Sequence, residues 1–334
     1  MRMWKRGPGV PEAGTSAAAV ATALLGSRRV AVCGHVTPDG DAVGSVLALT
    51  LALRSVGVPA LPVLADHHAG PVTYRFLPGF ELYEIADTLD PVDVFVALDT
   101  PSWRRLGAAE RLARDAATVV VIDHHADNEH FGTLNLVDSS AASASSLVWS
   151  LLPALGVQPD EAIATACYTG LVTDTGRFSY GNTTPTALRD AADMIRAGAQ
   201  AQRVYARVYE SRTPASLTLL GRVLSRITIA NDGRVAYSWM TDDDLHETGA
   251  VPEDTENIVD AVRQVGGVDA VVFFKVQHDQ VKVSLRAKCP TLDVAAVAHD
   301  FGGGGHTAAA GAAAPLPLES AIEAVLARLP GAKR

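Results

Sequence analysis

Residues 94–99 read VFVALD and residues 119–125 read VVVIDHH. Each stretch is an unbroken apolar run that ends in an aspartate, as is typical of parallel strands buried on both faces of a sheet. Working outward, residues 30–33 (VAVC) and 60–64 (ALPVL) are further runs of this kind, and a helical pattern over about residues 41–56 separates them. This alternation predicts an α/β fold with an open, mostly parallel sheet flanked by helices.

The second half of the chain has a different character. From residue 143 to about residue 209 the pattern is mostly helical. Residues 226–239 then predict a β-hairpin around Asn231-Asp232-Gly233, and residues 268–288 predict a second hairpin around His278-Asp279. Two hairpins with helices between them indicate a smaller C-terminal α+β domain. We therefore predict a first domain over residues 1–209, a linker over residues 210–216 and a second domain over residues 217–334.

The composition excludes several classes of protein. With 334 residues, 48% of them hydrophobic and 19% charged, the chain is long enough for two domains and too apolar to be disordered. No apolar run is long enough for a membrane-spanning helix, so we expect no membrane partner. The net charge of −9 argues against binding to long nucleic acid. Three scattered cysteines are too few for a disulfide framework, which predicts a cytoplasmic protein.

Acidic residues and histidines gather where the predicted strands end. Because ligand sites of open α/β sheets lie beyond the carboxyl ends of the strands, these side chains should meet at one edge. A further carboxylate follows the helical pattern that ends near residue 172. The candidates are His35, Asp39 and Asp41 after the first strand, Asp99 after residues 94–98, Asp123, His124 and His125 after residues 119–122, and Asp174.

Such a cluster needs protons or cations. Two carboxylates about 4 Å apart repel each other by roughly 4 kcal/mol at an effective dielectric constant of 20. Histidines among them favour a transition metal such as manganese, iron, cobalt or zinc over calcium. The surplus of carboxylates suggests two ions about 3.5–4 Å apart that share an aspartate, an arrangement that hydrolyses phosphate esters.

Each residue also has an ordinary structural interpretation. Asp39 with Gly40 is a common turn, and Asp41 could cap the next helix. Asp66-His67-His68 has the same three letters as Asp123-His124-His125 and also follows a predicted strand. No other acidic cluster lies near it, and we interpret it as a solvated loop. The joint pattern, rather than any three letters, carries the prediction.

Five segments resemble motifs of the DHH phosphoesterase superfamily, and they occur in the family's order. Residues 35–45 (HVTPDGDAVGS) resemble the first motif, and residues 302–311 (GGGGHTAAAG) resemble the glycine-rich motif of the accessory DHHA1 domain. The remaining three are Leu98-Asp99-Thr100, Asp123-His124-His125 and Thr173-Asp174-Thr175-Gly176. The compact length resembles the branch of nanoRNases and pAp phosphatases, which also contains hydrolases of linear and cyclic dinucleotides.

The resemblance implies a role for each residue, with two manganese ions as cofactors. One ion would be bound by His35, Asp39 and Asp99, and the other by Asp41, Asp99, His124 and Asp174. His125 would face the substrate phosphate, and Asp123 would orient a histidine or the adjacent backbone. The family also implies a homodimer. Gly40 and Gly44 would let the loop and the helix start approach the ions.

Substrate binding is predicted in the second domain. Residues 280–288 alternate, with apolar side chains on one face and Lys282, Ser284, Arg286 and Lys288 on the other. This pattern alone also fits an ordinary solvated strand. With the DHHA1 resemblance, we expect Arg286 and His306 to hold a substrate phosphate or base, and the backbone of Gly303, Gly304 and Gly305 to approach an anion.

The sequence therefore predicts a manganese-dependent phosphoesterase that hydrolyses short RNA and dinucleotides such as pApA to mononucleotides. Cyclic di-AMP and the 3′-phosphate of adenosine 3′,5′-bisphosphate (pAp) are further candidate substrates. Three alternatives stay open: an inorganic pyrophosphatase with a similar metal-binding domain, an exonuclease acting on single-stranded DNA, and a nucleotide-binding regulator without catalysis.

Overall fold

The structure, a computed structural model, describes residues 15–66, 70–255, 258–277 and 279–331. The chain forms two compact units, and the boundary between them along the sequence lies between Ser211 and Arg212. Helix α7 (Ala201–Tyr209) ends the first unit, and α8 (Pro214–Ser225) begins the second. Residues 214–216 of the predicted linker therefore belong to a helix, because Thr213 caps its N-terminus and Pro214 suits its first turn.

The first unit contains a six-stranded sheet in the order β3-β2-β1-β4-β5-β6, and every neighbouring pair is parallel. This confirms the predicted α/β class and all four apolar runs. The sequence did not indicate the outer strands β3 and β6, which are short and only partly buried or exposed. The strands are β1 (Val30–Cys33), β2 (Ala60–Leu64), β3 (Glu84–Ile85), β4 (Val94–Leu98), β5 (Thr118–Asp123) and β6 (Leu134–Val137).

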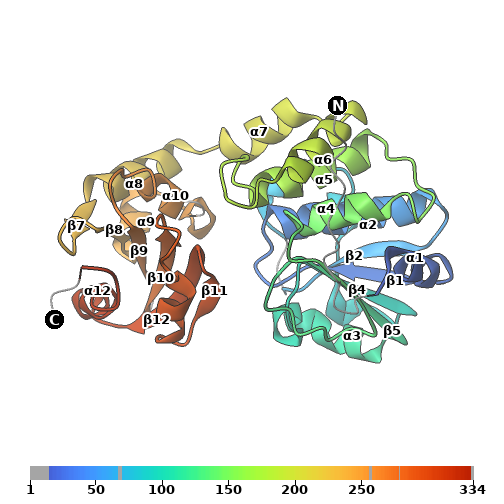
Figure 1. Cartoon of the computed structure of the whole chain (residues 1–334), viewed down its shortest axis with the longest axis horizontal. Coiled ribbons are helices and arrows are strands. Elements are labelled where there is room, and N and C mark those ends of the chain that lie inside the picture. The colour runs from blue at the N-terminus through green and yellow to red at the C-terminus, as the bar shows by residue number, and fades with distance from the viewer. Residues whose placement is uncertain (1–14, 67–69, 256–257, 278, 332–334) are drawn as a thin grey trace, which may run out of the picture. The chain divides into compact units, whose positions relative to one another are not determined.

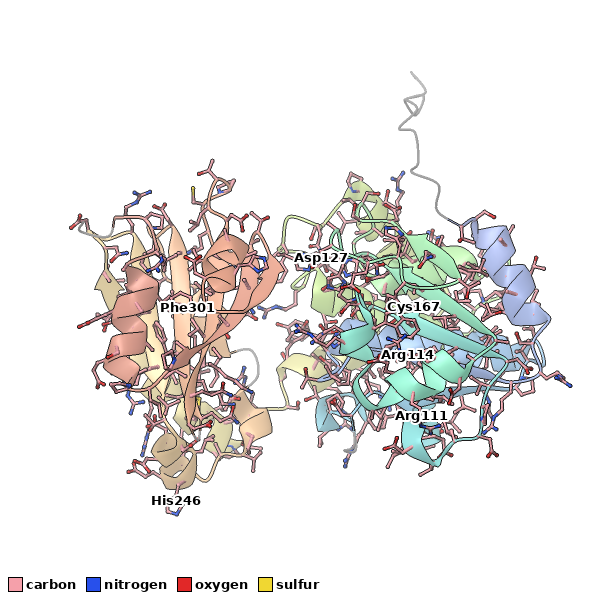
Figure 2. All side chains as sticks on the ribbon, turned by 90° about the horizontal axis from the view of Figure 1, so that it is seen from below. Arg111, Arg114, Asp127, Cys167, His246 and Phe301 are labelled. Carbon is pink, nitrogen blue, oxygen red and sulfur yellow. The ribbon has the colours of Figure 1, made fainter. Side chains whose placement is uncertain are left out.

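Helices cover both faces of this sheet (Figure 1). One face packs against α1 (Ala17–Leu25), α2 (Gly40–Ser55), α4 (Ala144–Leu151) and α5 (Glu161–Asp174), with α6 (Pro185–Arg196) and α7 outside them. The other face packs against the 3₁₀ helix η4 (Trp103–Ala109) and α3 (Glu110–Asp115). Helix α3 exposes Arg111 and Arg114 to solvent (Figure 2).

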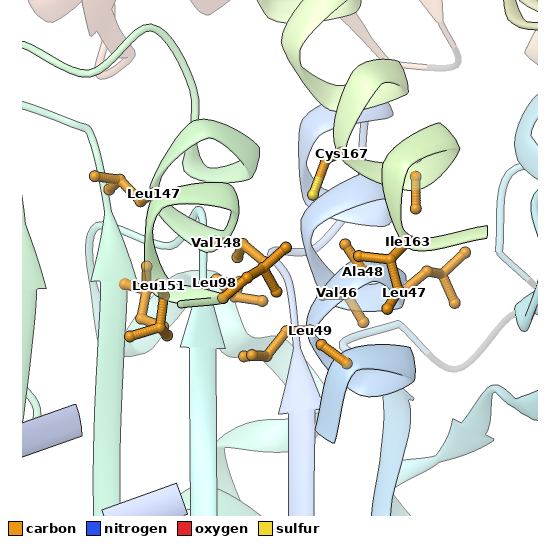
Figure 3. Packing of buried hydrophobic residues seen from close by; sticks show 14 of the residues in the cluster. Val46, Leu47, Ala48, Leu49, Leu98, Leu147, Val148, Leu151, Ile163 and Cys167 are labelled. Carbon is orange, nitrogen blue, oxygen red and sulfur yellow. The ribbon is translucent and has the colours of Figure 1, made fainter. Parts of the chain in front are cut away.

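Continuous apolar packing fixes the helices against the sheet. One hydrophobic cluster contains Leu98 of β4, Val148 and Leu151 of α4, Ala48 of α2 and Cys167 of α5, and all five side chains are fully buried (Figure 3). Each buried side chain of valine or leucine size stabilises the fold by about 1.5–3 kcal/mol. The three cysteines of the chain are free thiols. The core therefore holds the ends of β4 and α5 at a fixed separation.

The strand order creates a crevice at one edge of the sheet. Strand β1 lies between β2 and β4, so the chain moves to one side of β1 through α2 and later returns to its other side. The segments that follow β1 and β4 diverge at this topological switch point, where open α/β sheets bind their ligands. Residues 34–41 and Asp99 lie in these segments. The third motif follows β5, the strand next to β4, so the fold gathers the first three motifs at one edge of the sheet.

Glycines let α2 and α5 pack unusually closely. A Cβ atom on Gly44 would lie 2.5 Å from the carbonyl oxygen of Ala166, and one on Gly40 would lie 2.4 Å from Oγ1 of Thr173. Gly170 of α5 similarly has no room, because Oδ1 of Asp41 lies 2.4 Å from its hypothetical Cβ. The space next to Gly40 and Gly44 is therefore filled by α5. This contact gives a structural reason for both glycines, and their role in an approach to ions stays a prediction.

We predict that Gly44→Ala lowers the free energy of unfolding by about 1–3 kcal/mol, because the added methyl group overpacks the α2–α5 contact. Gly221→Ala is the matched control, since Gly221 also lies inside a helix but its Cβ would meet nothing within 4 Å. That variant should gain about 1 kcal/mol from helix propensity. Denaturant unfolding of both variants measures the difference, and equal effects would contradict the close contact.

The second unit is built on a sheet in the order β11-β12-β10-β9-β8-β7. The pairs β7–β8 and β9–β10 are antiparallel, which confirms both predicted hairpins, although His278 in the second turn lies outside the described residues. Strand β8 pairs with β9 in parallel, so the sheet is mixed. The strands are β7 (Thr228–Ala230), β8 (Val235–Met240), β9 (Ala270–Gln277), β10 (Gln280–Ala287), β11 (Gly304–His306) and β12 (Ala309–Pro315).

Helices again cover both faces of this second sheet. One face packs against α8 and α10 (Ile258–Val262), and the other against α11 (Val294–His299) and α12 (Leu318–Leu326). Helix α9 (Asp242–Thr248) follows β8. Within the described ranges, none of the helices has the length and apolar character needed to cross a bilayer.

Candidate metal centre

Asp99 lies at the middle of the candidate site. It directly follows β4, is 2% exposed and has a φ of 54°, in the left-handed region that residues other than glycine rarely adopt. Its Oδ2 lies 3.5 Å from Nε2 of His35, and its Oδ1 lies 3.4 Å from Nε2 of His124. One carboxylate therefore presents each of its oxygens to a different histidine.

Two groups of potential ligands lie on either side of Asp99. On one side, Nε2 of His35 lies 3.8 Å from Oδ1 of Asp39. On the other, Nε2 of His124 lies 3.7 Å from Oδ2 of Asp174 and 4.0 Å from Oδ2 of Asp41. The donor atoms within each of the sets His35–Asp39–Asp99 and Asp41–His124–Asp174 lie within 4.8 Å of one another.

The backbone fixes the orientation of several of these side chains. Nδ1 of His35 lies 2.8 Å from the carbonyl oxygen of Val36, which favours a proton on Nδ1 and turns Nε2 toward the carboxylates of Asp39 and Asp99. Asp39 caps α2 by accepting hydrogen bonds from the backbone N–H groups of Asp41 and Ala42. The helix cap considered for Asp41 is therefore made by Asp39, which is also a predicted metal ligand.

Asp41 does not cap its own helix and instead lies at the N-terminus of α4. Its Oδ2 accepts a hydrogen bond from the N–H group of Ala144 at 2.6 Å, and its Oδ1 accepts one from that of Ser145 at 3.0 Å. The positive end of the helix dipole stabilises a carboxylate there. Asp41 is nevertheless 1% exposed, so its charge is almost fully removed from water.

The buried carboxylates and histidines of the site shift the pKa values of one another. Burial, followed by the nearby Asp99, raises the pKa of Asp41 to about 7, and burial together with Asp41 raises the pKa of Asp174 well above its usual range. Burial alone would lower the pKa of His35 and His124, but Asp99 and the neighbouring carboxylates raise both to about 10. Burial also opposes ionisation of Asp99, yet His124 and His35 hold its pKa well below the usual range.

These residues fit a pair of divalent cations. Donor atoms bound about 2.1 Å from one tetrahedral or octahedral ion lie roughly 3.0–4.2 Å apart, and the five separations above, from 3.4 to 4.0 Å, fall in this interval. Oδ1 of Asp99 is buried and has no hydrogen-bond partner in the described structure. A buried anionic oxygen without a partner is costly, and a bound cation would remove that cost.

Asp123 has a different environment from the other carboxylates. Its Oδ1 accepts a hydrogen bond from the N–H group of His124 at 2.8 Å and lies 2.8 Å from Nδ1 of His125, while Nδ2 of Asn128 donates to its Oδ2. Asn128 also donates to the carbonyl oxygen of Thr100 and so connects the segments after β4 and β5. Asp123 is thus occupied with orienting its neighbours.

Two supporting residues were missed by the sequence analysis. Oδ2 of Asp66 accepts a hydrogen bond at 2.7 Å from the N–H group of Thr37, which has a left-handed φ of 51° between His35 and Asp39. Asp66 lies in a bend after β2 and is partly buried, so its position in a loop agrees with the interpretation, while His67 and His68 lie outside the described residues. Nδ2 of Asn182 donates to Oδ2 of Asp174 at 3.3 Å. No sequence signal marked either contact, because each joins segments separated by turns.

The predicted substrate-binding residues lie in the second unit. Arg286 is partly buried on β10, with Nε 3.7 Å from Oδ1 of Asp260. His306 is exposed on β11. A Cβ atom on Gly303 or Gly305 would lie within 2.1–2.6 Å of carbonyl oxygens of β12, so strand packing requires both glycines, whereas Gly304 has only a distant neighbour. Anion binding at this loop stays a prediction.

The fold and site together define an α/β protein with a carboxylate–histidine cluster at the switch point of its sheet. The family model described as "DHH family, N-terminal domain" matches residues 29–171, and that of the DHHA1 domain matches residues 232–330. The bifunctional oligoribonuclease and PAP phosphatase NrnA of Thermus thermophilus is 37% identical over 294 residues, which cover 87% of this chain and 86% of that protein. The chain therefore belongs to the DHH family of phosphoesterases, in the form that carries a DHHA1 domain, which confirms the resemblance.

Two solved structures share the fold. An exopolyphosphatase-related protein from Bacteroides fragilis has a TM-score of 0.85 at 24% identity, covering 91% of this chain and 92% of that chain. RecJ from Thermus thermophilus, solved in complex with Mn²⁺, has a TM-score of 0.58 at 18% identity, covering 95% of this chain and 55% of that chain. A protein of the same fold thus accommodates manganese.

We predict that the protein without divalent cations becomes less stable as the pH rises from about 6.5 to about 10. His35 and His124 have pKa values raised from 6.5 to about 10, so the stability they contribute is complete below pH 6.5 and is lost across this interval. The melting temperature in EDTA should fall by about 4 °C or more, which corresponds to 1–2 kcal/mol in a domain of this size.

Added Mn²⁺ should abolish this decline, because deprotonated ligands bind a cation more strongly. His246→Asn is the matched control, since His246 lies on α9 in the second unit (Figure 2) and its loss should leave the slope unchanged. A flat melting temperature across the interval in EDTA would contradict the charge balance described here.

Proposed function

We propose that this chain is a two-metal phosphodiesterase and phosphatase that hydrolyses short RNA and dinucleotides such as pApA to mononucleotides, and that pAp and cyclic di-AMP are further substrates. The relative from Thermus thermophilus bears both activities in its name, oligoribonuclease and PAP phosphatase. Its 37% identity extends over both family domains of this chain. The net charge of −9 disfavours long nucleic acid and favours short substrates whose charge can be neutralised locally.

The single observation that carries this proposal is the position of Asp99. Its two oxygens lie 3.5 Å and 3.4 Å from the Nε2 atoms of His35 and His124, so it can bridge two cations. His35 and Asp39 would complete one ligand set, and His124 the other, together with Asp41 and Asp174. Two bridged cations supply activation of water and stabilisation of the charge that develops on a phosphoryl group. Manganese suits this mixture of imidazole and carboxylate ligands.

His125 is the proposed contact to the reacting phosphate. Its Nδ1 lies 2.8 Å from Oδ1 of Asp123 and 3.5 Å from Oδ1 of Asp99. Burial would lower its pKa, but Asp123 and Asp99 raise it above the ordinary histidine value. A protonated imidazole held in this way can stabilise negative charge on the phosphate or donate a proton to the leaving oxygen. Asp123 acts through His125 and the adjacent backbone.

The second unit is the proposed site for the remainder of the substrate. Arg286 and His306 would bind a phosphate or base, with Gly303, Gly304 and Gly305 beside them. The alternating burial of β10 agrees with an apolar face in the core and a polar face toward ligand or solvent. A homodimer remains a prediction from the family.

We predict that Asp99→Asn abolishes turnover of pApA, pAp and short RNA, because the neutral amide cannot bridge two cations. The loss should exceed the roughly 10- to 100-fold effect of removing a residue that only supports a metal ligand. Mn²⁺ titration by calorimetry should show fewer than two bound ions. Asp138→Asn is the matched control, since Asp138 also follows a strand of this sheet but is exposed and should be dispensable.

The same assay distinguishes the alternatives if inorganic pyrophosphate and a long single-stranded DNA are included with added Mn²⁺. The wild-type protein should hydrolyse pApA faster than either. Faster hydrolysis of pyrophosphate than of pApA would favour a pyrophosphatase, and faster hydrolysis of the DNA would favour an exonuclease. Near-normal turnover by Asp99→Asn at saturating Mn²⁺ would refute the bridging role, and no turnover of any substrate would favour a regulator without catalysis.

A further inference from the structure

The chain leaves α5, the helix that ends at Asp174, through an unusual left-handed turn. Gly176, Arg177 and Phe178 have φ values of 55°, 62° and 61°. A left-handed conformation is sterically unfavourable for the two residues with side chains. The turn holds because the N–H group of Arg177 donates to the carbonyl oxygen of Val172 at 2.8 Å and that of Phe178 donates to Oγ1 of Thr175 at 3.3 Å.

This turn sends its two side chains to different environments. Phe178 packs against the core of the first unit, with its ring centroid 6.4 Å from that of Tyr168. Arg177 is exposed, and its Cζ lies 5.0 Å from the ring centroid of Tyr209. The rings of Tyr209 and Tyr205 lie 5.3 Å apart on α7. We call Arg177, Tyr205 and Tyr209 the arginine–tyrosine patch.

The patch is anchored to the same helix end as a proposed metal ligand. The hydroxyl group of Tyr209 donates to the carbonyl oxygen of Val172 at 3.5 Å, the oxygen that also accepts from Arg177. Val172 lies two residues before Asp174, which is about 3 Å along the helix axis. The arginine–tyrosine patch and Asp174 are thus held by one turn of α5.

The charge of Arg177 is not neutralised by the protein. Among the described residues, no ion pair joins its guanidinium group to a carboxylate. Arg114 offers a contrast, because it stacks over Trp103 at 4.2 Å but also forms an ion pair with Glu110. Stacking on Tyr209 occupies one face of the guanidinium plane of Arg177, and its N–H groups at the edge can donate hydrogen bonds to the acceptor atoms of a base.

We propose that the arginine–tyrosine patch is a subsite for the nucleotide that follows the scissile phosphodiester. The guanidinium group of Arg177, which is exposed, and the ring of Tyr205, which is 43% exposed, contact its base. Tyrosine rings and arginine planes are the surfaces on which unstacked bases of single strands bind without sequence preference. This inference rests on the proposed function, because it assigns the second nucleotide of the same substrate.

The test compares a substrate that has a second nucleotide with one that lacks it. Both pApA and pAp offer a phosphate ester to the metal centre, but only pApA has a second nucleotide. Arg177→Ala and Tyr205→Ala should raise the KM for pApA at least fivefold more than the KM for pAp, the lower end of the effect of losing one base–aromatic stack. Arg114→Ala is the matched control, an exposed arginine over an aromatic ring of the same unit, and it should change neither KM (Figure 2).

A second measurement needs no turnover. A dinucleotide with 2-aminopurine as its second base should lose fluorescence on binding to the EDTA-treated wild-type protein, because stacking quenches this base. Tyr205→Ala and Arg177→Ala should abolish the quenching, while their melting temperatures show that they fold.

An equal rise in KM for both substrates would overturn the subsite, because it would indicate damage to the metal centre. Unchanged quenching in both variants would overturn it as well. If the wild-type protein hydrolyses neither substrate, the proposed function fails, whereas the fluorescence still reports separately whether the arginine–tyrosine patch binds a base.

Discussion

The whole site depends on one buried carboxylate that faces two histidines at once. Asp99 directly follows β4, and its backbone is in the left-handed region. Its Oδ1 remains without a hydrogen-bond partner in the described structure. Such a group is stable only beside positive charge, which protons on His35 and His124 or bound cations can supply.

Close helix packing extends this requirement to α2 and α5. Asp41 and Asp174 come from different helices, and both must approach His124. Gly44 and Gly170 allow the helix axes to come close enough, since any side chain at either position would collide with the partner helix. In this fold a packing constraint between helices is also a constraint on the chemistry of the site.

The sequence was informative where the physics is local. Apolar runs identified the central strands, since a strand buried on both faces cannot contain polar residues. Once the strands were known, the carboxyl ends located Asp99 and His124. The hydrogen bonds that orient Asp41 were not predictable, because their donors at the start of α4 lie about a hundred residues further along the chain. The edge strands β3 and β6 also escaped prediction, since their few residues are not fully buried and carry no clear pattern.

The two Asp-His-His triplets show how position in the fold separates equal sequences. Asp123 and Asp66 both orient backbone N–H groups, so neither aspartate is set apart by its hydrogen bonds alone. The difference lies in the strand that each follows. Asp123 ends β5, which lies beside β4, and the next residue, His124, therefore reaches Asp99. Asp66 follows β2, on the other side of β1, and its carboxylate instead holds the loop that carries His35 and Asp39. Strand order thus decides that the segment after β5 brings the proposed ligand His124 to Asp99, and that Asp66 holds the loop beside it.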